Sequence, residues 1–304
     1  GATHNTCTNK PCFLSVCEGK LLKKIGLIGA GVVGSALASW LQDSGYEITA
    51  IASRSHSSAQ RLATRVGSRA VEIEDVATGC QLLFITTPDQ AIAQVCDQIA
   101  GFGFDSCQAV FHLSGALSSQ ILVPAKEAGL GVASMHPIGS FANIQQARKS
   151  LPHSWYTIEG NPRGRELAAE LLTRLGAKFR QIQPQQKPLY HTAAVFASNY
   201  LVSLLSVAEE LWQQLGPEPS EGLWELAGGT LANIHRLGTA QSLTGPIQRG
   251  DLDTVALHLE VLAAKPAYLK LYKQLGLAAL KLADDLNEKQ KQSLTLLLRG
   301  VDEE

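Results

Sequence analysis

The sequence lacks the features that would mark several whole classes of protein. Its formal net charge is only −1 over 304 residues, so no global positive field would attract nucleic acid or an anionic membrane surface. No run of 18 or more residues is uninterruptedly apolar, and the most apolar segment, residues 193–205, contains Ser198, Asn199 and Ser203. We therefore expect neither a nucleic-acid partner nor a membrane-spanning segment.

A metal-binding cysteine pattern is also missing. The six cysteines form no CxxC pair and match no zinc-ligand spacing, so we expect no metal site. Cys80, Cys96 and Cys107 lie in apolar or helical contexts and are predicted to be buried free thiols. Free thiols of this kind fit a reducing, cytoplasmic location.

The first 22 residues have no periodic pattern of apolar side chains. They are polar and hold Cys7, Cys12 and Cys17. We treat residues 1–22 as an N-terminal extension, either disordered or derived from an expression tag, and leave them out of the fold prediction.

What the sequence does contain, from residue 23 on, is an alternation of strand-like and helix-like segments. Strands that alternate with helices predict a parallel, doubly wound sheet, so residues 23–184 are expected to form an α/β Rossmann domain that binds a dinucleotide. Strand patterns then stop, and helical periodicity continues to about residue 298. We expect residues 185–304 to form an all-helical domain that contributes to the substrate site.

A glycine-rich turn follows the first predicted strand, residues 24–28, and precedes a predicted helix. It has the spacing GxGxxG, in which the glycines allow a tight turn, close approach of a pyrophosphate and close helix packing. The amides at the helix N-terminus would then face the phosphates. The residues expected to contact the cofactor here are Gly29, Ala30, Gly31, Val32, Val33 and Gly34.

The second predicted strand ends without the acidic residue that binds the ribose 2′-hydroxyl of NAD. The chain instead has Ser53, Arg54 and Ser55, with Arg61 further along as a second candidate. An arginine between hydroxyl groups can bind a 2′-phosphate. The sequence therefore favours NADP over NAD, although Arg54 could also be a solvated loop residue.

Other polar residues follow the ends of later strands, where ligands of parallel sheets bind. Thr86, Thr87 and Pro88 follow one strand and are expected to contact the cofactor, while Ser114 and His136 follow two others. Histidine titrates closest to neutral pH, so His136 is the first candidate for acid–base chemistry. The alternative is a histidine that only caps backbone groups beside Pro137.

The first helix of the second domain, predicted to run from residue 187 to about 215, carries polar groups along one stripe. Lys187 and His191 share a face, and Asn199 lies beside it. These groups could face substrate and nicotinamide, or could be satisfied by neighbouring backbone. We rank His191 second and Lys187 third as acid–base candidates, and expect Ser114 and Asn199 to hydrogen-bond the reacting group.

A later segment combines a turn with a helix start. Arg249 could bind a substrate carboxylate or form an inter-subunit salt bridge, and Asp251 or Asp253 could cap the next helix. His258, on that helix, is expected to be structural.

Six segments together resemble one family: GLIGAGVVGSAL, ITTPDQAI, HLSGAL, MHPIGSF, YHTAAVFASNY and LTGPIQRGDLDTVALHL. The family consists of predicted oxidoreductases with an N-terminal Rossmann domain and a C-terminal helical domain of unknown function. The chain is more distantly similar to hydroxyacid, ketopantoate, pyrroline-carboxylate and prephenate dehydrogenases. In prephenate dehydrogenases a strand-end serine precedes a His-Pro-Met motif. Here Ser114 and His136 stand in a similar relation, but Ile138 replaces the methionine.

The resemblance implies hydride transfer between NADP(H) and a small carbonyl, imine or hydroxy acid. It also implies a homodimer formed through the C-terminal helices. A ketopantoate-reductase-like enzyme is one alternative, and an NADP-binding sensor without turnover is another. In hydroxyacid dehydrogenases a catalytic lysine precedes an asparagine by four residues, whereas here His191 follows Lys187 at that spacing.

Overall fold

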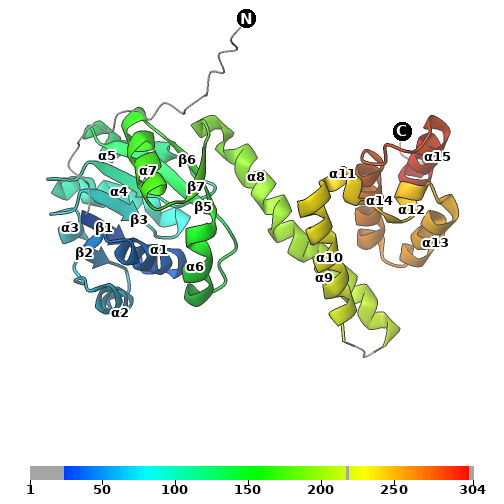
Figure 1. Cartoon of the computed structure of the whole chain (residues 1–304), viewed down its shortest axis with the longest axis horizontal. Helices are drawn as coiled ribbons and strands as arrows, with labels where there is room; N and C mark the ends of the chain where they lie inside the picture. Colours follow the sequence, from blue (N-terminus) through cyan, green and yellow to red (C-terminus); the bar gives the residue numbers. More distant parts are fainter. Residues whose placement is uncertain (1–23, 217–218, 301–304) are drawn as a thin grey trace, which may run out of the picture. The chain divides into compact units, whose positions relative to one another are not determined.

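The computed structural model describes residues 24–216 and 219–300. The chain divides into two compact units, one ending at Ser198 and one beginning at Asn199, and each is described by itself (Figure 1).

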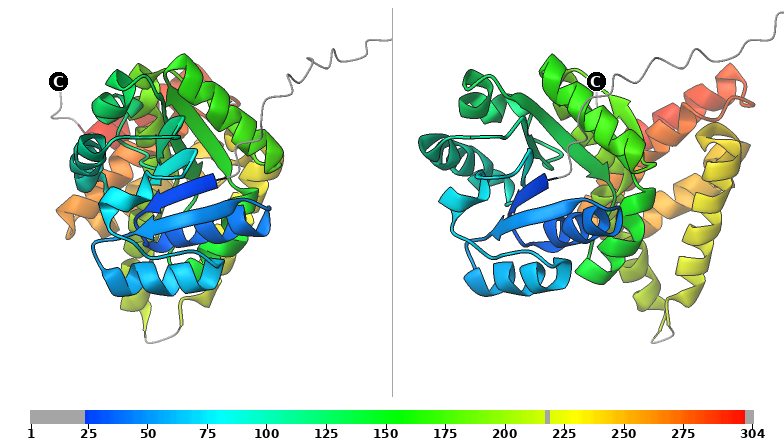
Figure 2. Two further views of the ribbon diagram at one scale, coloured as in Figure 1. Left: turned by 90° about the vertical axis from the view of Figure 1, so that its left-hand side faces the viewer. Right: turned by 60° about the vertical axis from the view of Figure 1, so that its left-hand side comes forward.

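The first unit is built on a seven-stranded sheet with the order β2-β1-β3-β4-β5-β6-β7 (Figure 2). All neighbouring strands are parallel except β5 and β6, which are antiparallel. The predicted parallel, doubly wound sheet is therefore confirmed over β1 to β5, with β6 and β7 added at one edge. The strands are β1 (Lys24–Ile28), β2 (Glu47–Ala52), β3 (Leu82–Ile85), β4 (Ala109–His112), β5 (Gly131–Ile138), β6 (Trp155–Gly160) and β7 (Lys178–Gln181).

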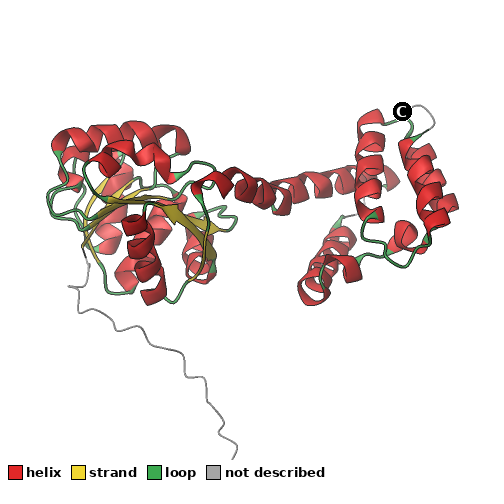
Figure 3. Cartoon of the chain, turned by 90° about the horizontal axis from the view of Figure 1, so that it is seen from above, coloured by secondary structure: helices red, strands yellow, loops and turns green. Residues whose placement is uncertain are grey.

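Helices cover both faces of this sheet (Figure 3). One face packs against α1 (Val32–Asp43), α2 (His56–Val66), α6 (Ile144–Ser150) and α7 (Pro162–Arg174). The other packs against α3 (Ile73–Val76), α4 (Asp89–Phe102), the 3-10 turn η1 (Ser119–Leu122) and α5 (Val123–Glu127). Because both faces are covered, β3 and β4 are buried at every residue and read as continuous apolar runs rather than as alternating ones.

The strand order brings the carboxyl end of β1 to a topological switch point. The chain passes from β1 to β2 on one side and returns to β3 on the other, so the β1–α1 and β3–α4 loops diverge there. Ligands of open α/β sheets bind in the crevice at such a point.

Strand β5 is longer than the sequence indicates. It was expected to end at Met135, but antiparallel pairing with β6 extends it to Ile138 and sets His136 opposite Thr157. Pairing with β4 stops at Ser134. His136 thus lies beyond the carboxyl edge of the parallel strands, yet on a rigid strand rather than in a loop.

The long helix predicted from residue 187 is two helices. After the 3-10 turn η3 (Pro184–Gln186), α8 (Lys187–Ala197) ends at Ser198, whose backbone angles are not helical, and α9 (Asn199–Trp212) follows. The expected domain boundary fell after residue 184, whereas α8 belongs to the compact unit of the sheet. The side chain of Lys187, at the start of α8, is buried against the sheet.

The second unit is helical throughout its described part, as predicted for the C-terminal domain. A small apolar core joins α12 (Gly245–Arg249), α13 (Leu252–Leu262), α14 (Pro266–Leu280) and α15 (Glu288–Arg299). This unit also contains α9, the 3-10 turn η4 (Gln213–Leu215), α10 (Glu221–Leu237) and α11 (Thr239–Ser242). The 3-10 turn η2 (Leu151–His153) belongs to the first unit.

One helical stretch among the described residues is long and apolar enough to cross a membrane by length and composition alone. It is Pro184–Leu215, whose most apolar window has a mean hydropathy of 1.3 and no buried residue. The expectation that the chain does not enter a membrane therefore stays a prediction.

Three smaller expectations are confirmed. Cys80, Cys96 and Cys107 are buried free thiols. Asp251 caps α13 by accepting a hydrogen bond from the Thr254 amide at 3.0 Å. His258 is held within the second unit by a 2.9 Å contact between its Nδ1 and the Tyr272 hydroxyl.

Cys7, Cys12, Cys17 and the proposed N-terminal extension lie outside the described residues. Within the described ranges, no group of three or more His, Cys, Asp or Glu side chains could hold a metal ion.

Candidate active site

The glycine turn between β1 and α1 has the geometry that dinucleotide binding requires. Gly29 has φ +114°, and a Cβ there would lie 2.6 Å from the Thr86 backbone. A Cβ on Gly34 would lie 2.3 Å from Thr86 Oγ1. At Gly31, by contrast, a Cβ would meet nothing within 4 Å. The first and third glycines are thus required by packing, while the second leaves open space where a pyrophosphate can approach the backbone.

The β3 end closes this turn from one side. Thr86 donates its amide to the Ile28 carbonyl at 2.7 Å and its hydroxyl to the Gly29 carbonyl at 2.7 Å, so it holds the turn in place. Thr87 Oγ1 is buried and has no hydrogen-bond partner among the residues that the structure describes. A buried hydroxyl without a partner is available to a ligand at the switch point. Pro88 follows as the exposed residue before α4.

A chain of hydroxyl groups marks the end of β2. Ser55 caps α2 by accepting from the Ser58 amide. Its Oγ lies 3.1 Å from the Oγ atoms of both Ser57 and Ser58, and Arg61 Nη2 donates to Ser58 Oγ at 2.9 Å. These donors, with the exposed Arg54, stand at a helix N-terminus, which is a suitable place for a phosphate. Arg61, the second candidate from the sequence, is therefore joined through Ser58 to the hydroxyl groups at the end of β2.

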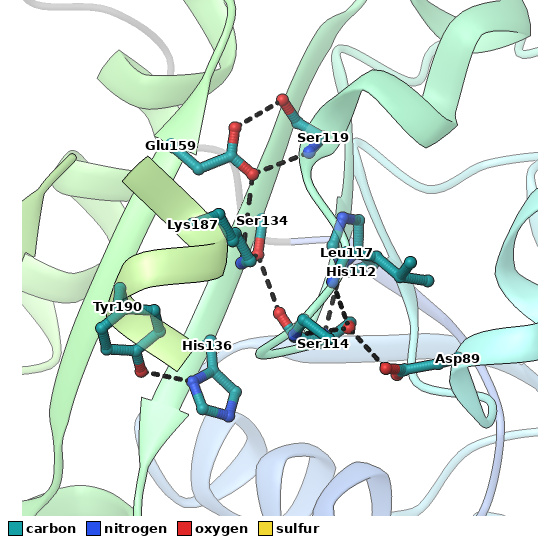
Figure 4. Close-up of polar contacts among 11 residues, drawn as sticks. Asp89, His112, Ser114, Leu117, Ser119, Ser134, His136, Glu159, Lys187 and Tyr190 are labelled. Carbon is teal, nitrogen blue, oxygen red and sulfur yellow. Dashed lines mark hydrogen bonds and ion pairs between the residues drawn. The ribbon is translucent and has the colours of Figure 1, made fainter. Parts of the chain in front are cut away.

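Two histidines meet at the loop that follows β4, and Figure 4 shows one of them, His136, with its polar surroundings. His136 projects from β5 and His191 from α8, with ring centroids 6.4 Å apart. A Cβ on Gly115 would lie 2.8 Å from His136 Nε2 and 2.9 Å from His191 Nδ1. His191 Nδ1 is buried and makes no hydrogen bond to any described residue. The structure thus brings together the two histidines that the sequence ranked first and second.

The His136 ring is kept neutral by its surroundings. Its pKa is lowered to about 4, chiefly by burial and to a smaller extent by the nearby Lys187 and then His191. On its other side, Nδ1 lies 2.5 Å from the Tyr190 hydroxyl. Sequence reasoning missed Tyr190, although it stands three residues after Lys187 and next to His191, on the same face of a helix.

Ser114 has a fully used hydroxyl group. It donates to Asp89 Oδ2 at 2.8 Å and accepts from the amides of Ala116 and Leu117 at 3.2 and 2.9 Å. These bonds shape the loop that carries Gly115. Its predicted contact with the reacting group stays a prediction, because a substrate would have to displace one of these partners.

His112, the last residue of β4, supports the same loop. It is fully buried, and its Nδ1 accepts from the Ser114 amide at 3.1 Å. Burial lowers its pKa to about 3, with a further contribution from the Lys187 charge. His112 is therefore neutral and structural.

Lys187 ends in a buried polar network (Figure 4). Its side chain is 1% exposed, and its Nζ donates a hydrogen bond to Ser134 Oγ. The same Nζ lies 4.0 Å from Oε1 of Glu159, whose side chain is also buried. Glu159 in turn accepts from the amide and hydroxyl of Ser119 at 2.7 and 2.8 Å. Burial lowers the pKa of Lys187 to about 8, against the opposing effect of Glu159.

This network ties α8 to β5, β6 and η1. The ammonium group of Lys187 already contacts Ser134 and Glu159. A direct acid–base role for Lys187 therefore stays a prediction, and one that this geometry does not favour. Glu159 was missed by the sequence analysis, and the available signal was a lone carboxylate at the end of an apolar strand.

The remaining candidates belong to the second unit. Asn199 begins α9, and its carbonyl accepts from Ser203 Oγ at 3.2 Å. Arg249 ends α12 with a largely exposed side chain, 3.9 Å from Asp251 Oδ2. Their contacts with substrate stay predictions.

Two domain families match the chain. Residues 15–137 match a Rossmann-like domain, and residues 154–279 match a domain of unknown function, DUF2520. A search of curated protein sequences finds no significant match.

Several solved structures share the fold. Protein TM1727 from Thermotoga maritima is 26% identical, with a TM-score of 0.70 over 86% of this chain and 98% of that one. A reductive aminase from Aspergillus terreus, in complex with NADPH and ethyl-5-oxohexanoate, is 17% identical, with a TM-score of 0.60 over 92% and 93%. A pyrroline-5-carboxylate reductase from Coxiella burnetii is 14% identical, with a TM-score of 0.57 over 88% and 100%.

At 17% and 14% identity, the second and third similarities concern the fold alone. The two family matches account for most of the chain on either side of residues 138–153. The chain is therefore similar to a Rossmann-like domain over its first matched part and to a DUF2520 domain over its second.

Proposed function

We propose that the protein is an NADP-dependent oxidoreductase that acts on a small carbonyl, imine or hydroxy acid. The observation that carries this proposal is the glycine turn: packing requires Gly29 and Gly34, while Gly31 leaves space open at the switch point. The unpartnered Thr87 hydroxyl and the histidine pair lie on loops or strands that end at the same edge of the sheet.

The choice of NADP rests on the end of β2. No carboxylate is present at Ser53, Arg54 and Ser55, and the hydroxyl chain leads from Ser55 to Arg61. Two arginines and several hydroxyl donors at a helix N-terminus suit a 2′-phosphate, which a carboxylate would repel. The NADPH named in the reductive aminase complex is in keeping with this choice.

The chain's own residues would position the substrate and manage one proton. When bound, NADPH would supply the hydride. His136 and His191 would then face the substrate oxygen or nitrogen, and Ser114 and His112 would hold the loop between them. Arg249 is a candidate for an anionic end of the substrate, as in a ketopantoate-like acid, and Asn199 for a further hydrogen bond.

A titration of NADPH and NADH against two glycine variants tests the cofactor site. Gly31→Ala should keep the wild-type fold, since its Cβ meets no atom, but should weaken NADPH binding by at least about tenfold, or about 1.4 kcal/mol. Gly34→Ala should lower the unfolding temperature, because its Cβ would collide with Thr86. Wild-type affinity for NADPH in Gly31→Ala, or equal affinities for NADH and NADPH in the wild type, would contradict the proposed site.

Turnover is measured separately, with a panel of small ketones, 2-oxo acids and cyclic imines in the presence of NADPH. Oxidation of NADPH with any of them supports the enzyme. Tight NADPH binding without turnover across the panel would favour the alternative of an NADP-binding sensor.

A further inference from the structure

The hydroxyl of Tyr190 hydrogen-bonds the His136 ring. It lies 2.5 Å from Nδ1, with the rings edge to face at 71° and centroids 5.7 Å apart. Both partners are held by regular structure, His136 by β5 and Tyr190 by α8, one turn after the anchored Lys187. The positions of both side chains in this contact are therefore fixed by the secondary structure that carries them.

The direction of this hydrogen bond follows from acidity. A phenol is a far stronger acid than a neutral imidazole N–H, so the Tyr190 hydroxyl donates and Nδ1 accepts. The reverse direction needs a proton on Nδ1, either in the other neutral tautomer or in a charged ring. The greater acidity of the phenol disfavours the other neutral tautomer, and the charged ring is disfavoured because His136 is half-buried and close to the charge of Lys187. Lys187 and His191 from α8 and His112 from β4 are the titratable groups around it, apart from Tyr190 itself. The ring is thus neutral, with its one proton on Nε2.

The protonated nitrogen points to the place where the two histidines meet. His136 Nε2 faces the Gly115 loop, and His191 Nδ1 faces the same point. A Cβ at position 115 would crowd both nitrogens, so a glycine there keeps this point free of side-chain atoms from the loop. A substrate atom that reaches this loop therefore meets an N–H donor on the His136 side.

We infer that Tyr190 is a positioning residue that holds His136 as the Nε2–H tautomer and supplies, through it, the proton used in carbonyl reduction. This inference rests on the proposed function. As the carbonyl carbon receives its hydride, Nε2–H gives its proton to the carbonyl oxygen. Nδ1 takes the hydroxyl proton of Tyr190 at the same time. His136 stays neutral and changes tautomer, and the Tyr190 phenolate, which is much less basic than an alkoxide, regains a proton from water.

The same tautomer narrows the substrate class. A carbonyl oxygen has only lone pairs and accepts from Nε2–H. A protonated imine has no free lone pair on nitrogen and cannot accept. We therefore expect a ketone or oxo acid as the substrate rather than a preformed iminium ion.

The tautomer is tested by ring ¹⁵N NMR of histidine-labelled protein, with His136→Gln to assign the resonances. The wild type should show His136 protonated at Nε2 and unprotonated at Nδ1 at pH 7. Tyr190→Phe should release this preference, giving a mixture of tautomers. A wild-type His136 protonated at Nδ1, or at both nitrogens, would overturn the inference, whether or not the protein turns over a substrate.

The proton supply is tested by kinetics. Tyr190→Phe should lower kcat for the best carbonyl substrate by at least about tenfold, with KM for NADPH unchanged. Tyr272→Phe is the matched control, because it removes a second tyrosine–histidine bond, to His258 Nδ1, with a similar edge-to-face ring geometry. That control should keep the wild-type kcat.

Equal kcat values for Tyr190→Phe and Tyr272→Phe would refute the proton supply. If the wild type turns over no member of the panel, the proposed function fails, and the ¹⁵N result alone decides whether Tyr190 sets the tautomer.

Discussion

The protonation and contacts of the histidines in this protein depend on where each side chain lies in the fold. His112, His136 and His258 are all histidines, yet the first is sealed in the sheet, the second is half-buried at the candidate site and the third bonds a tyrosine in the helical unit. Burial is the largest cause of the lowered pKa for both His112 and His136. The near-neutral pKa of a free histidine was the basis for choosing His136 from the sequence, whereas in the structure the pKa of its ring is lowered to about 4.

The two lowered pKa values predict acid sensitivity. In the unfolded chain these rings titrate near pH 6.5, whereas folded His136 and His112 have pKa values of about 4 and about 3. Between these limits the unfolded state binds more protons, so the free energy of unfolding falls as the pH falls below about 6.5. Each histidine contributes a slope of up to about 1.4 kcal/mol per pH unit. Urea denaturation at pH 7, 6 and 5 measures the slope.

His112→Asn serves as the comparison for this prediction, because carboxylates also contribute to acid sensitivity. Its slope should be shallower than that of the wild type between pH 6 and 5. Identical slopes would show that His112 is not a buried neutral group.

At the scale of elements, helix α8 is the part whose position decides the site. It carries Lys187, Tyr190 and His191 on one face, and Lys187 ties it to Glu159 on β6 and Ser134 on β5. The Lys187–Glu159 ion pair is buried, so the cost of desolvating the two charges offsets much of their attraction. The pair therefore fixes the position of α8 more than it adds to the net stability of the fold.

Removing one partner of this pair should be costly. Lys187→Met leaves the Glu159 carboxylate buried without its cation and should lower the free energy of unfolding by about 3–5 kcal/mol. Arg174→Ala breaks the exposed ion pair with Glu170 and should cost less than about 1 kcal/mol. Chemical denaturation compares the two.

The double variant Lys187→Met/Glu159→Gln should recover part of the loss, because it removes both charges. A loss in Lys187→Met no larger than that in Arg174→Ala would mean that the pair is not buried in solution.

At the scale of the whole molecule, the helical unit exposes a large apolar surface. A groove of about 540 Å³ is lined by apolar side chains of α9, α10 and α14, and its lining residues Leu204 and Leu226 remain 41% and 68% exposed. Contiguous apolar surface of this kind marks an interaction site. We propose that a second copy of the chain covers it, which would give the homodimer expected from the family resemblance.

Light scattering after size exclusion should therefore give twice the chain mass of 32.5 kDa. Leu204→Asp and Leu226→Asp should shift the protein to the monomer, because each would bury a charge in the interface. Phe102→Asp, at a 55% exposed position of the sheet unit, should leave the dimer intact. A monomeric wild type would contradict the proposal.

The sequence by itself determined the local features of this protein. The glycine spacing, the apolar strands, the missing acid after β2 and the helical periodicity are properties of neighbouring residues, and the structure confirms the first strand at Lys24–Ile28, the alternation of strands and helices that follows it, and the helical C-terminal part. His136 could be selected as an acid–base candidate because it follows a predicted strand, and His191 because it lies on the polar face of a predicted helix.

Only the tertiary structure decided what those residues touch. The pairing of β5 with β6 moved His136 from a loop onto a strand, and the packing of α8 paired Lys187 with Glu159 and Tyr190 with His136. These partners are 28 and 54 residues apart in the chain. Burial and hydrogen bonding, which set the protonation of each group, depend on such distant contacts, and no periodicity or spacing along the chain records them.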